Sequence, residues 1–189
     1  MAFLRRDELL FLVLWSSGYI GAKIGLPHAG TFTLLFYRYL LAIIILAVVV
    51  TFLHGWRKPD FSTLLTGVFA HFVWLVAILK AFEFGIGAGA AALIAALQPI
   101  LTGALAPFLL NERNTKLQWL GILTGLVGVV VFVNADSGNS NVALWVYSLP
   151  FIATASLTFI TILERRRAFK AAGGADKNMP IFTALFWQV

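Results

Sequence analysis

Apolar blocks of about twenty residues, separated by short polar connections, are the feature of this sequence that most limits its fold. A helix of about twenty apolar residues is long enough to cross the hydrocarbon core of a bilayer. Because that core offers the backbone no hydrogen-bond partners, only helices and closed barrels span it. The sequence therefore predicts an all-α transmembrane protein, a polytopic helix bundle.

We expect six complete helices and the truncated start of a seventh near Met179. The six are expected at Leu9–Leu26, Phe32–Leu53, Ser62–Glu83, Ala88–Leu110, Lys116–Asn134 and Val142–Leu163. The run Asn134–Asn141 is rich in Asn, Asp, Ser and Gly, which indicates an exposed loop. The residues after Met179 are too few for a span of about twenty, so we expect the sequence to be a fragment of a longer protein.

Lys and Arg are concentrated in alternate connections of the chain. The basic segments contain Arg5 and Arg6, then Arg57 and Lys58, then Arg113 and Lys116, and then Arg165, Arg166, Arg167, Lys170 and Lys177. The connections around Pro27–Thr31, Phe84–Gly87 and Asn134–Asn141 contain no Lys or Arg. Short basic loops remain in the cytoplasm. The pattern therefore predicts a multi-pass protein of the cell membrane with a cytoplasmic N-terminus.

The composition excludes several classes of protein. With 60% hydrophobic and only 12% charged residues, and a mean hydropathy of +0.91, the chain is not an ordinary soluble domain. The basic residues lie in loops that meet anionic lipid head groups, so they do not indicate nucleic-acid binding. The absence of Cys excludes disulfides and thiolate metal sites. We expect no cofactor and no metal. The expected partners are the lipid bilayer and a small-molecule substrate, with a homodimer as an open alternative.

Polar and aromatic residues within the spans are the candidates for a substrate cavity. Trp15, Tyr19 and Lys23 are four residues apart and share one helix face. They line a cavity or, alternatively, the aromatic rings face lipid and Lys23 extends to the outer surface. His71 and Trp74 lie near the middle of the third span. His71 either carries a coupling proton or bonds to a neighbouring helix.

The fourth span has a second polar group near the depth where transporter sites lie. Gln98, with Thr102 one turn further on, holds either a ligand or another helix. Pro99 removes a backbone hydrogen bond and is expected to kink the helix. We predict that the polar and aromatic groups share one space between the first, third and fourth helices: Trp15, Tyr19, His71, Trp74 and Gln98.

Two charged residues are candidates for other roles. Arg38 lies about six residues, or roughly 9 Å, below the outer end of the second helix. It either reaches the interface or pairs with a substrate or an acidic partner. Glu112 lies in the connection before Lys116, and we expect it to form a salt bridge with Arg113, Lys116 or a nearby basic loop.

The segment Ala88–Val133 carries the most specific pattern. A helix of small residues with a central proline is followed by a Leu-x-Glu turn and a Gln-Trp-x-Gly motif: Pro99, then Leu110 and Glu112, then Gln118, Trp119 and Gly121. The first two spans fit as well, with Trp15, Lys23 and Arg38. Over Leu9–Val133 this order and spacing resembles the EamA repeat of the drug/metabolite transporter superfamily.

The resemblance implies a transporter with two five-helix repeats in opposite orientations. Residues 1–134 would form the first repeat, and residues 142–189 an incomplete second one. It also implies a secondary transporter that exports small metabolites such as amino acids. Since alternating access needs two halves, we expect the 189-residue chain alone not to transport.

Three alternatives compete with this interpretation. A small multidrug exporter predicts a buried carboxylate in the first helix, which that span lacks. A flippase for lipid-linked substrates remains open. An intramembrane hydrolase would need a pair such as Ser16 and His71, but the sequence has no Gly-x-Ser-x-Gly nucleophile turn. We therefore expect a transporter and not an enzyme, with no catalytic residues.

Overall fold

The computed structural model describes residues 6–110, 112–172 and 181–189, and over these residues all regular structure is helical. Five helical segments are long and apolar enough to cross a membrane: Thr31–Leu53, Phe61–Glu83, Ala88–Leu109, Lys116–Gly138 and Leu144–Arg167. Helix α1 (Arg6–Gly25) is not among these five, and it contains the polar Ser16, Ser17 and Lys23. The expected polytopic helix bundle is confirmed.

Several of the expected spans are built from more than one helical piece. The second span combines α2 (Thr31–Val49) with the π-helical η1 (Val50–His54). The third combines α3 (Phe61–Thr66), the π-helical η2 (Gly67–Val73) and α4 (Trp74–Glu83). A π-helix has i→i+5 backbone hydrogen bonds and so carries one extra residue in its turn. In η2, the Phe69 carbonyl accepts a hydrogen bond from the Ser156 hydroxyl, and the His71 carbonyl accepts one from the Tyr39 hydroxyl.

The fourth span is broken where the proline was expected to act. It consists of α5 (Ala88–Ala95) and α6 (Leu97–Leu109), which meet at Ala96. Pro99 has no N–H to donate to the carbonyl four residues earlier, at Ala95, so the helix is interrupted there. The break therefore lies within one turn of Gln98.

The remaining elements are α7 (Lys116–Asn139), the 3₁₀-helix η3 (Leu144–Tyr147), α8 (Ser148–Ala172) and α9 (Ile181–Gln188). The predicted loop at Asn134–Asn141 is wrong over most of its length, because α7 continues to Asn139. The polar side chains there bond to their own helix: the Asn134 amide donates to the Val130 carbonyl, and the Ser137 hydroxyl to the Asn134 carbonyl. The predicted start of the seventh helix at Met179 lies outside the described residues.

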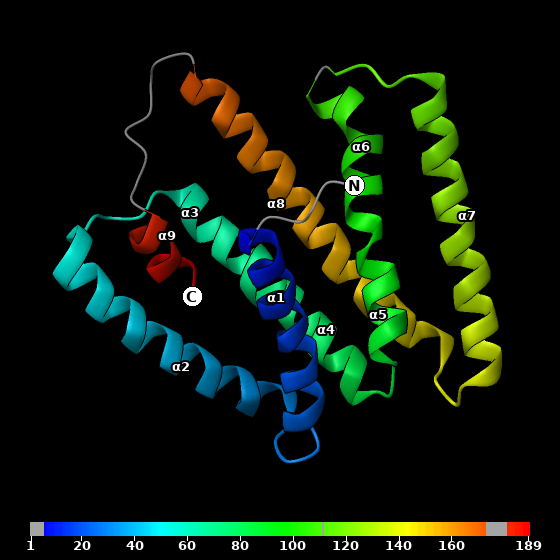
Figure 1. Ribbon diagram of the computed structural model, residues 1–189, viewed down its shortest axis with the longest axis horizontal. Coiled ribbons are helices and arrows are strands. Elements are labelled where there is room, and N and C mark those ends of the chain that lie inside the picture. Colours follow the sequence, from blue (N-terminus) through cyan, green and yellow to red (C-terminus); the bar gives the residue numbers. More distant parts are fainter. Residues whose placement is uncertain (1–5, 111, 173–180) are drawn as a thin grey trace.

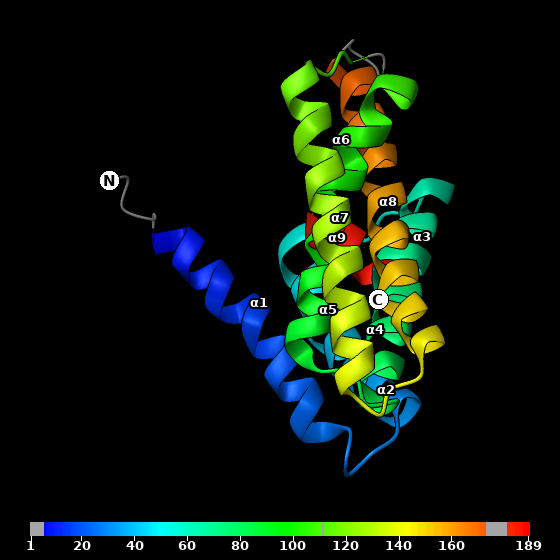
Figure 2. The same cartoon turned by 90° about the vertical axis from the view of Figure 1, so that its right-hand side faces the viewer.

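Helix α8 organises the bundle. It crosses the molecule diagonally in Figure 1 and packs against α4, α6 and η2. The short α9 packs on α2 and α3. Figure 2 shows α1 leaning away from the other helices along its N-terminal half, while its C-terminal half returns to the bundle. The C-terminal ends of α6 and α8 point to the same end of the bundle in Figure 1, which we call the arginine-rich end because α8 carries Arg165–Arg167 there.

The core lies where α4, α5, α7 and η3 meet. It is formed by small and branched side chains around Ala91, Ile94 and Tyr147. Gly125 of α7 allows close approach to α6, because a Cβ atom at this position would lie 2.5 Å from Ile100 Cδ1. At Gly121 and Gly128 a Cβ would meet nothing within 4 Å. Among these three glycines, only Gly125 is needed for close packing on a neighbouring helix.

Candidate functional site

A cavity of about 610 Å³ lies between α1, α4, the broken α5–α6 helix and α8. Its wall combines aromatic rings, alanines and a few uncharged polar groups: Trp15, Ser16, Tyr19, Trp74, Ala88, Ala92, Ala95, Ala96, Gln98, Pro99 and Leu157. The volume is within the range of small-molecule sites, which are mostly apolar with a few oriented polar groups. We call this space the central cavity.

Aromatic contacts hold α1 against α4 at the wall of the central cavity. The rings of Trp15 and Trp74 stack with centroids 5.6 Å apart and an interplanar angle of 30°. One turn along α1, Tyr19 meets the ring of Phe82 edge-on at 6.1 Å. Such pairs contribute about 0.5–1.5 kcal/mol beyond the burial of their area. The indole N–H of Trp74 is buried and has no hydrogen-bond partner among the described residues.

Gln98 joins the central cavity to α8. Its side-chain amide donates to the hydroxyl of Thr161 at 2.9 Å, and its backbone carbonyl accepts the hydroxyl of Thr102 at 2.8 Å. An amide in an apolar environment is costly without a partner, so the bond to Thr161 keeps Gln98 half-buried in a defined orientation. Helix α8 therefore contributes to the wall directly, through Leu157, and indirectly, by orienting Gln98.

A smaller cavity of about 120 Å³ adjoins the central cavity at the same aromatic residues. It shares Trp15, Tyr19 and Trp74 with the central cavity and also includes Arg38 of α2. The aromatic rings thus border both an uncharged space and one that contains a guanidinium group. Arg38 itself is exposed.

Four of the five residues that were expected to share one space do so: Trp15, Tyr19, Trp74 and Gln98. His71 does not, and it is half-buried beside Gln188 of α9 instead. Lys23, in the last turn of α1, is exposed and is not part of the wall. Thr102 bonds to its own helix instead. The Ser16–His71 pair of the hydrolase hypothesis is not formed, since Ser16 lines the cavity and His71 does not.

The other wall residues carried little signal in the sequence. Ala88, Ala92, Ala95 and Ala96 look like ordinary packing residues of a small-residue helix, although their spacing places them on one helix face. Leu157 is one of many apolar residues in α8. Its role depends on how α8 crosses the bundle, which local sequence does not specify.

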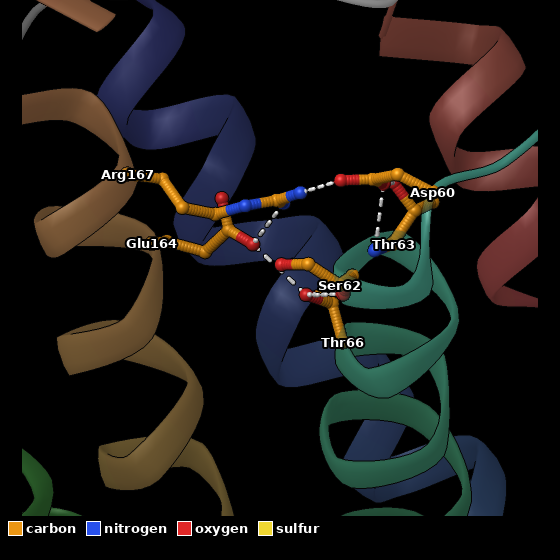
Figure 3. Close-up of polar contacts among 6 residues, drawn as sticks. All are labelled: Asp60, Ser62, Thr63, Thr66, Glu164 and Arg167. Atoms are coloured by element: carbon orange, nitrogen blue, oxygen red, sulfur yellow. Dashed lines mark hydrogen bonds and ion pairs between the residues drawn. The ribbon is translucent and has the colours of Figure 1, made fainter. Parts of the chain in front are cut away.

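The arginine-rich end is closed by a polar cluster that we call the arginine clasp: Asp60, Glu112, Glu164, Arg165 and Arg167. Figure 3 shows Arg167 and Glu164 of α8 reaching across to α3. Arg167 pairs with Asp60 at the N-cap of α3, and the hydroxyl of Thr66, at the end of α3, donates to Glu164 at 2.9 Å. Arg167 also pairs with Glu164, at 3.2 Å.

Arg165 extends the clasp to the connection after α6, where it pairs with Glu112 at 2.9 Å. Glu112 therefore forms the kind of salt bridge that was expected, with Arg165 in the basic last part of α8. The clasp ties the ends of three spans together, those that contain α3, α6 and α8.

Asp60 is also the N-cap of α3 and accepts bonds from the backbone and the hydroxyl of Thr63. Partial desolvation opposes its ionisation, but the Thr63 hydrogen bonds and the charge of Arg167 outweigh it, so the pKa of Asp60 falls below its usual value. Because folding lowers the pKa of this carboxyl, the clasp stabilises the folded state at neutral pH, and this stabilisation is lost as the pH falls through the lowered pKa.

The opposite end of the bundle has its own polar contacts. Lys80 and Glu83 of α4 form an i, i+3 ion pair at 2.9 Å, and the Thr31 hydroxyl donates to Glu83 at 2.6 Å. Lys80 also lies over the rings of Phe32 and Phe84. Among the described residues, no group of three or more His, Asp or Glu side chains is placed to hold a metal ion.

Two curated relatives are similar to most of this chain. One, from Salmonella typhimurium, is named "Probable amino-acid metabolite efflux pump" and is 29% identical over 184 residues, covering 94% of this chain and 58% of its own length. Its counterpart of the same name from Escherichia coli is 28% identical over 178 residues, with the same coverage. This chain thus spans less than two thirds of these relatives. No solved structure matches it.

The family comparison agrees with the motifs and with the bundle. The model of the EamA-like transporter family matches residues 9–134, which include α1 through most of α7. This match covers more than half of the chain and contains every residue of the central cavity except Leu157. The chain is a multi-pass membrane protein of a transporter family: it belongs to the EamA-like transporter family.

Proposed function

We propose that this chain forms one half of the pathway of a secondary transporter that exports small metabolites, with amino acids as the substrate class. The observation that carries the proposal is the uncharged, aromatic central cavity at the contact of α1, α4, α5–α6 and α8. Transport follows from the family, and the substrate class is taken from the names of the two relatives.

The cavity wall favours the apolar part of a metabolite. Trp15, Tyr19 and Trp74 offer ring surfaces, and Gln98 offers an amide group in an otherwise apolar space. A zwitterionic substrate also carries a carboxylate, for which Arg38 in the adjoining cavity is a cation that shares these aromatic walls. We propose that Arg38 attracts this carboxylate, while the central cavity holds the side chain.

The arginine clasp gives the proposed pathway a closed end. The wall of the central cavity runs from Ala88, at the start of α5, to Gln98 and Pro99 at the break. Asp60, Glu164 and Arg167 bind the helices together at the arginine-rich end. We propose that this end faces the cytoplasm, as basic loops do, and that the clasp is the inner gate of alternating access.

The first test concerns orientation. Because the chain has no Cys, single cysteines at exposed positions report which side each connection faces. Asn141→Cys, in the connection after α7, is expected to react with an impermeant maleimide added outside intact cells. Arg113→Cys is expected to react only after the inner surface is made accessible. The reverse pattern would refute the proposed orientation.

The second test is transport itself. The intact protein is purified from cells and reconstituted in proteoliposomes. We expect saturable flux of radiolabelled amino acids. Gln98→Leu should reduce this flux about fivefold, since loss of one hydrogen bond in an apolar site costs roughly 1 kcal/mol.

Arg38→Gln should raise KM about fivefold for substrates with a carboxylate, because roughly 1 kcal/mol is lost where a carboxylate is bound. It should leave the KM of the corresponding decarboxylated amines unchanged. The 189-residue chain alone is expected to give no saturable flux.

Other outcomes separate the alternatives. Movement of a fluorescent lipid between leaflets without amino-acid flux would favour a flippase. Saturable amino-acid flux by the 189-residue chain would mean that two copies supply both halves of the pathway. Absence of any selective flux from the intact protein would refute the proposed function.

A further inference from the structure

A groove of about 390 Å³ runs between α6 and α8, separate from the central cavity. On α6 its wall is formed by Leu101, Leu105 and Leu109, which are four residues apart and so lie on one helix face. Of these, Leu105 and Leu109 are 39% and 38% exposed. The groove is thus an open apolar surface at the depth of the bilayer.

The wall formed by α8 is apolar except at one end. It begins at Ala155 and Phe159, both exposed. Thr158 also lies on it, but its hydroxyl donates to the Thr154 carbonyl at 2.8 Å and is satisfied within the helix. The wall ends with Arg166, at the arginine-rich end.

The length of the groove matches one leaflet of a bilayer. From Leu101 to Leu109 the α6 wall rises about 12 Å, at roughly 1.5 Å per residue. Half of a hydrocarbon core of about 30 Å is about 15 Å. The groove therefore extends from near the middle of the membrane to the level of the head groups, where Arg166 lies.

Arg166 differs from its two neighbours in the chain. Arg165 and Arg167 are neutralised by carboxylates in the arginine clasp. Arg166 donates from Nε and Nη2 to the Leu109 carbonyl, at 2.9 and 2.7 Å, and among the described residues no carboxylate pairs with it. A guanidinium group has five N–H donors. The remaining donors of Arg166 are therefore available to an anion at the mouth of the groove.

We propose that this groove binds an anionic phospholipid of the leaflet at the arginine-rich end. An acyl chain lies along the α6 leucines and Phe159, and the head-group phosphate binds Arg166. Charge selects this occupant over a neutral lipid, because an uncompensated guanidinium at head-group level attracts anionic lipids. This inference does not depend on the proposed transport function.

The simpler alternative is that Arg166 only caps α6. A cation at a helix C-terminus is stabilising on its own, and the bonds to Leu109 would be made without lipid. The two explanations differ in what changes on substitution. A cap affects the stability of α6, whereas a lipid site affects which lipid occupies the groove.

The test is photolabelling of the intact protein in vesicles of phosphatidylethanolamine and phosphatidylglycerol. A trace of phosphatidylglycerol with a diazirine-bearing acyl chain is included, and labelled peptides are located by mass spectrometry. We expect labelling within residues 101–109 and 155–163. The same probe built on phosphatidylcholine is expected to label these segments at about one fifth of that level, because one cationic residue near the head groups favours an anionic over a neutral lipid by about this factor.

The variants separate the two explanations. Arg166→Gln should reduce phosphatidylglycerol labelling of the groove about fivefold, toward the phosphatidylcholine level, and Arg166→Lys should retain it. Ala155→Phe, which fills the groove and leaves Arg166 intact, should reduce labelling by either probe. Arg113→Gln, which removes the same charge from an exposed loop position, should have no effect.

Equal labelling by the two probes would overturn the proposal, because it would show that the groove binds lipid without regard to head-group charge. Absence of labelling in the folded protein would show that a protein segment fills the groove instead. If Arg166→Gln does not fold, the ratio of phosphatidylglycerol to phosphatidylcholine labelling in the unchanged protein tests selection by charge, and Ala155→Phe tests the location in the groove.

Discussion

Replacement of Arg167 by glutamate is expected to open the arginine-rich end of the bundle. In the structure Arg167 attracts both Asp60 and Glu164. With glutamate at this position both contacts become repulsive, and three carboxylates face one another. Exposed ion pairs contribute about 0.2–1 kcal/mol each, so reversing two of them changes the balance by roughly 1–3 kcal/mol. That corresponds to a population shift of about fivefold to a hundredfold.

The measurement is the reaction of a cysteine in the central cavity. In an Ala95→Cys background, an impermeant maleimide added at the arginine-rich side should react slowly while the clasp is closed. Arg167→Glu should accelerate this reaction about tenfold, within the range expected from two reversed ion pairs. The effect would report the inner gate that alternating access requires.

Two variants test the cause. Arg113→Glu makes the same charge change at an exposed position at the same end and should leave the rate unchanged. In the double variant Asp60→Arg with Arg167→Glu, the attraction between α3 and α8 is restored in reverse. Its rate should return toward the starting value, although the adjacent Glu164 limits the recovery. If the two single variants accelerate labelling equally, net charge and not the clasp controls access.

The second large effect is expected at Gly67, where η2 and α9 approach each other closely. A Cβ atom at this position would lie 2.7 Å from the Cα atom of Gln188 and 2.8 Å from its carbonyl oxygen. Backbone atoms cannot rotate away as a side chain can, so Gly67→Ala must displace α9. Overpacking of this kind costs about 1–3 kcal/mol.

Gly128→Ala is the matched control, since a Cβ there meets nothing within 4 Å. It should leave stability unchanged or raise it by roughly 0.5–1 kcal/mol, because alanine is the better residue inside a helix. Unfolding by titration with denaturing detergent compares the two variants. Equal stability would contradict the packing of α9 on η2. Gly67→Ala should also move Gln188 away from His71, which lies beside it.

Local sequence was sufficient for most of the spans and their boundaries. Five expected spans are present, because about twenty apolar residues in a row have one low-energy arrangement in a bilayer. The capping box at Thr115 and Gln118 is present with both of its bonds. The break in the fourth span comes before Pro99, as the missing N–H requires. Each of these depends on atoms only a few residues apart.

Local sequence did not predict the structure correctly where a polar side chain can bind one of several partners with similar free energy. The segment after Asn134 looks like a loop, but its side chains bond to carbonyls of the same helix and α7 continues. His71 was expected to face the cavity, yet it lies beside Gln188 of α9, far later in the chain. Which partner a polar group finds depends on distant helices, and sequence spacing does not encode their position.

The sequence by itself determined that the chain is a helical membrane protein of this family, through the length of its apolar blocks and the order of its motifs. Only the tertiary structure decided which side chains meet. Trp15 stacks on Trp74, and Gln98 bonds Thr161, because α1 and α8 cross the bundle at particular angles. Hydrophobic length places a helix across a membrane, but neighbouring helices set its tilt and rotation. The central cavity, the arginine clasp and the lipid groove all depend on that rotation.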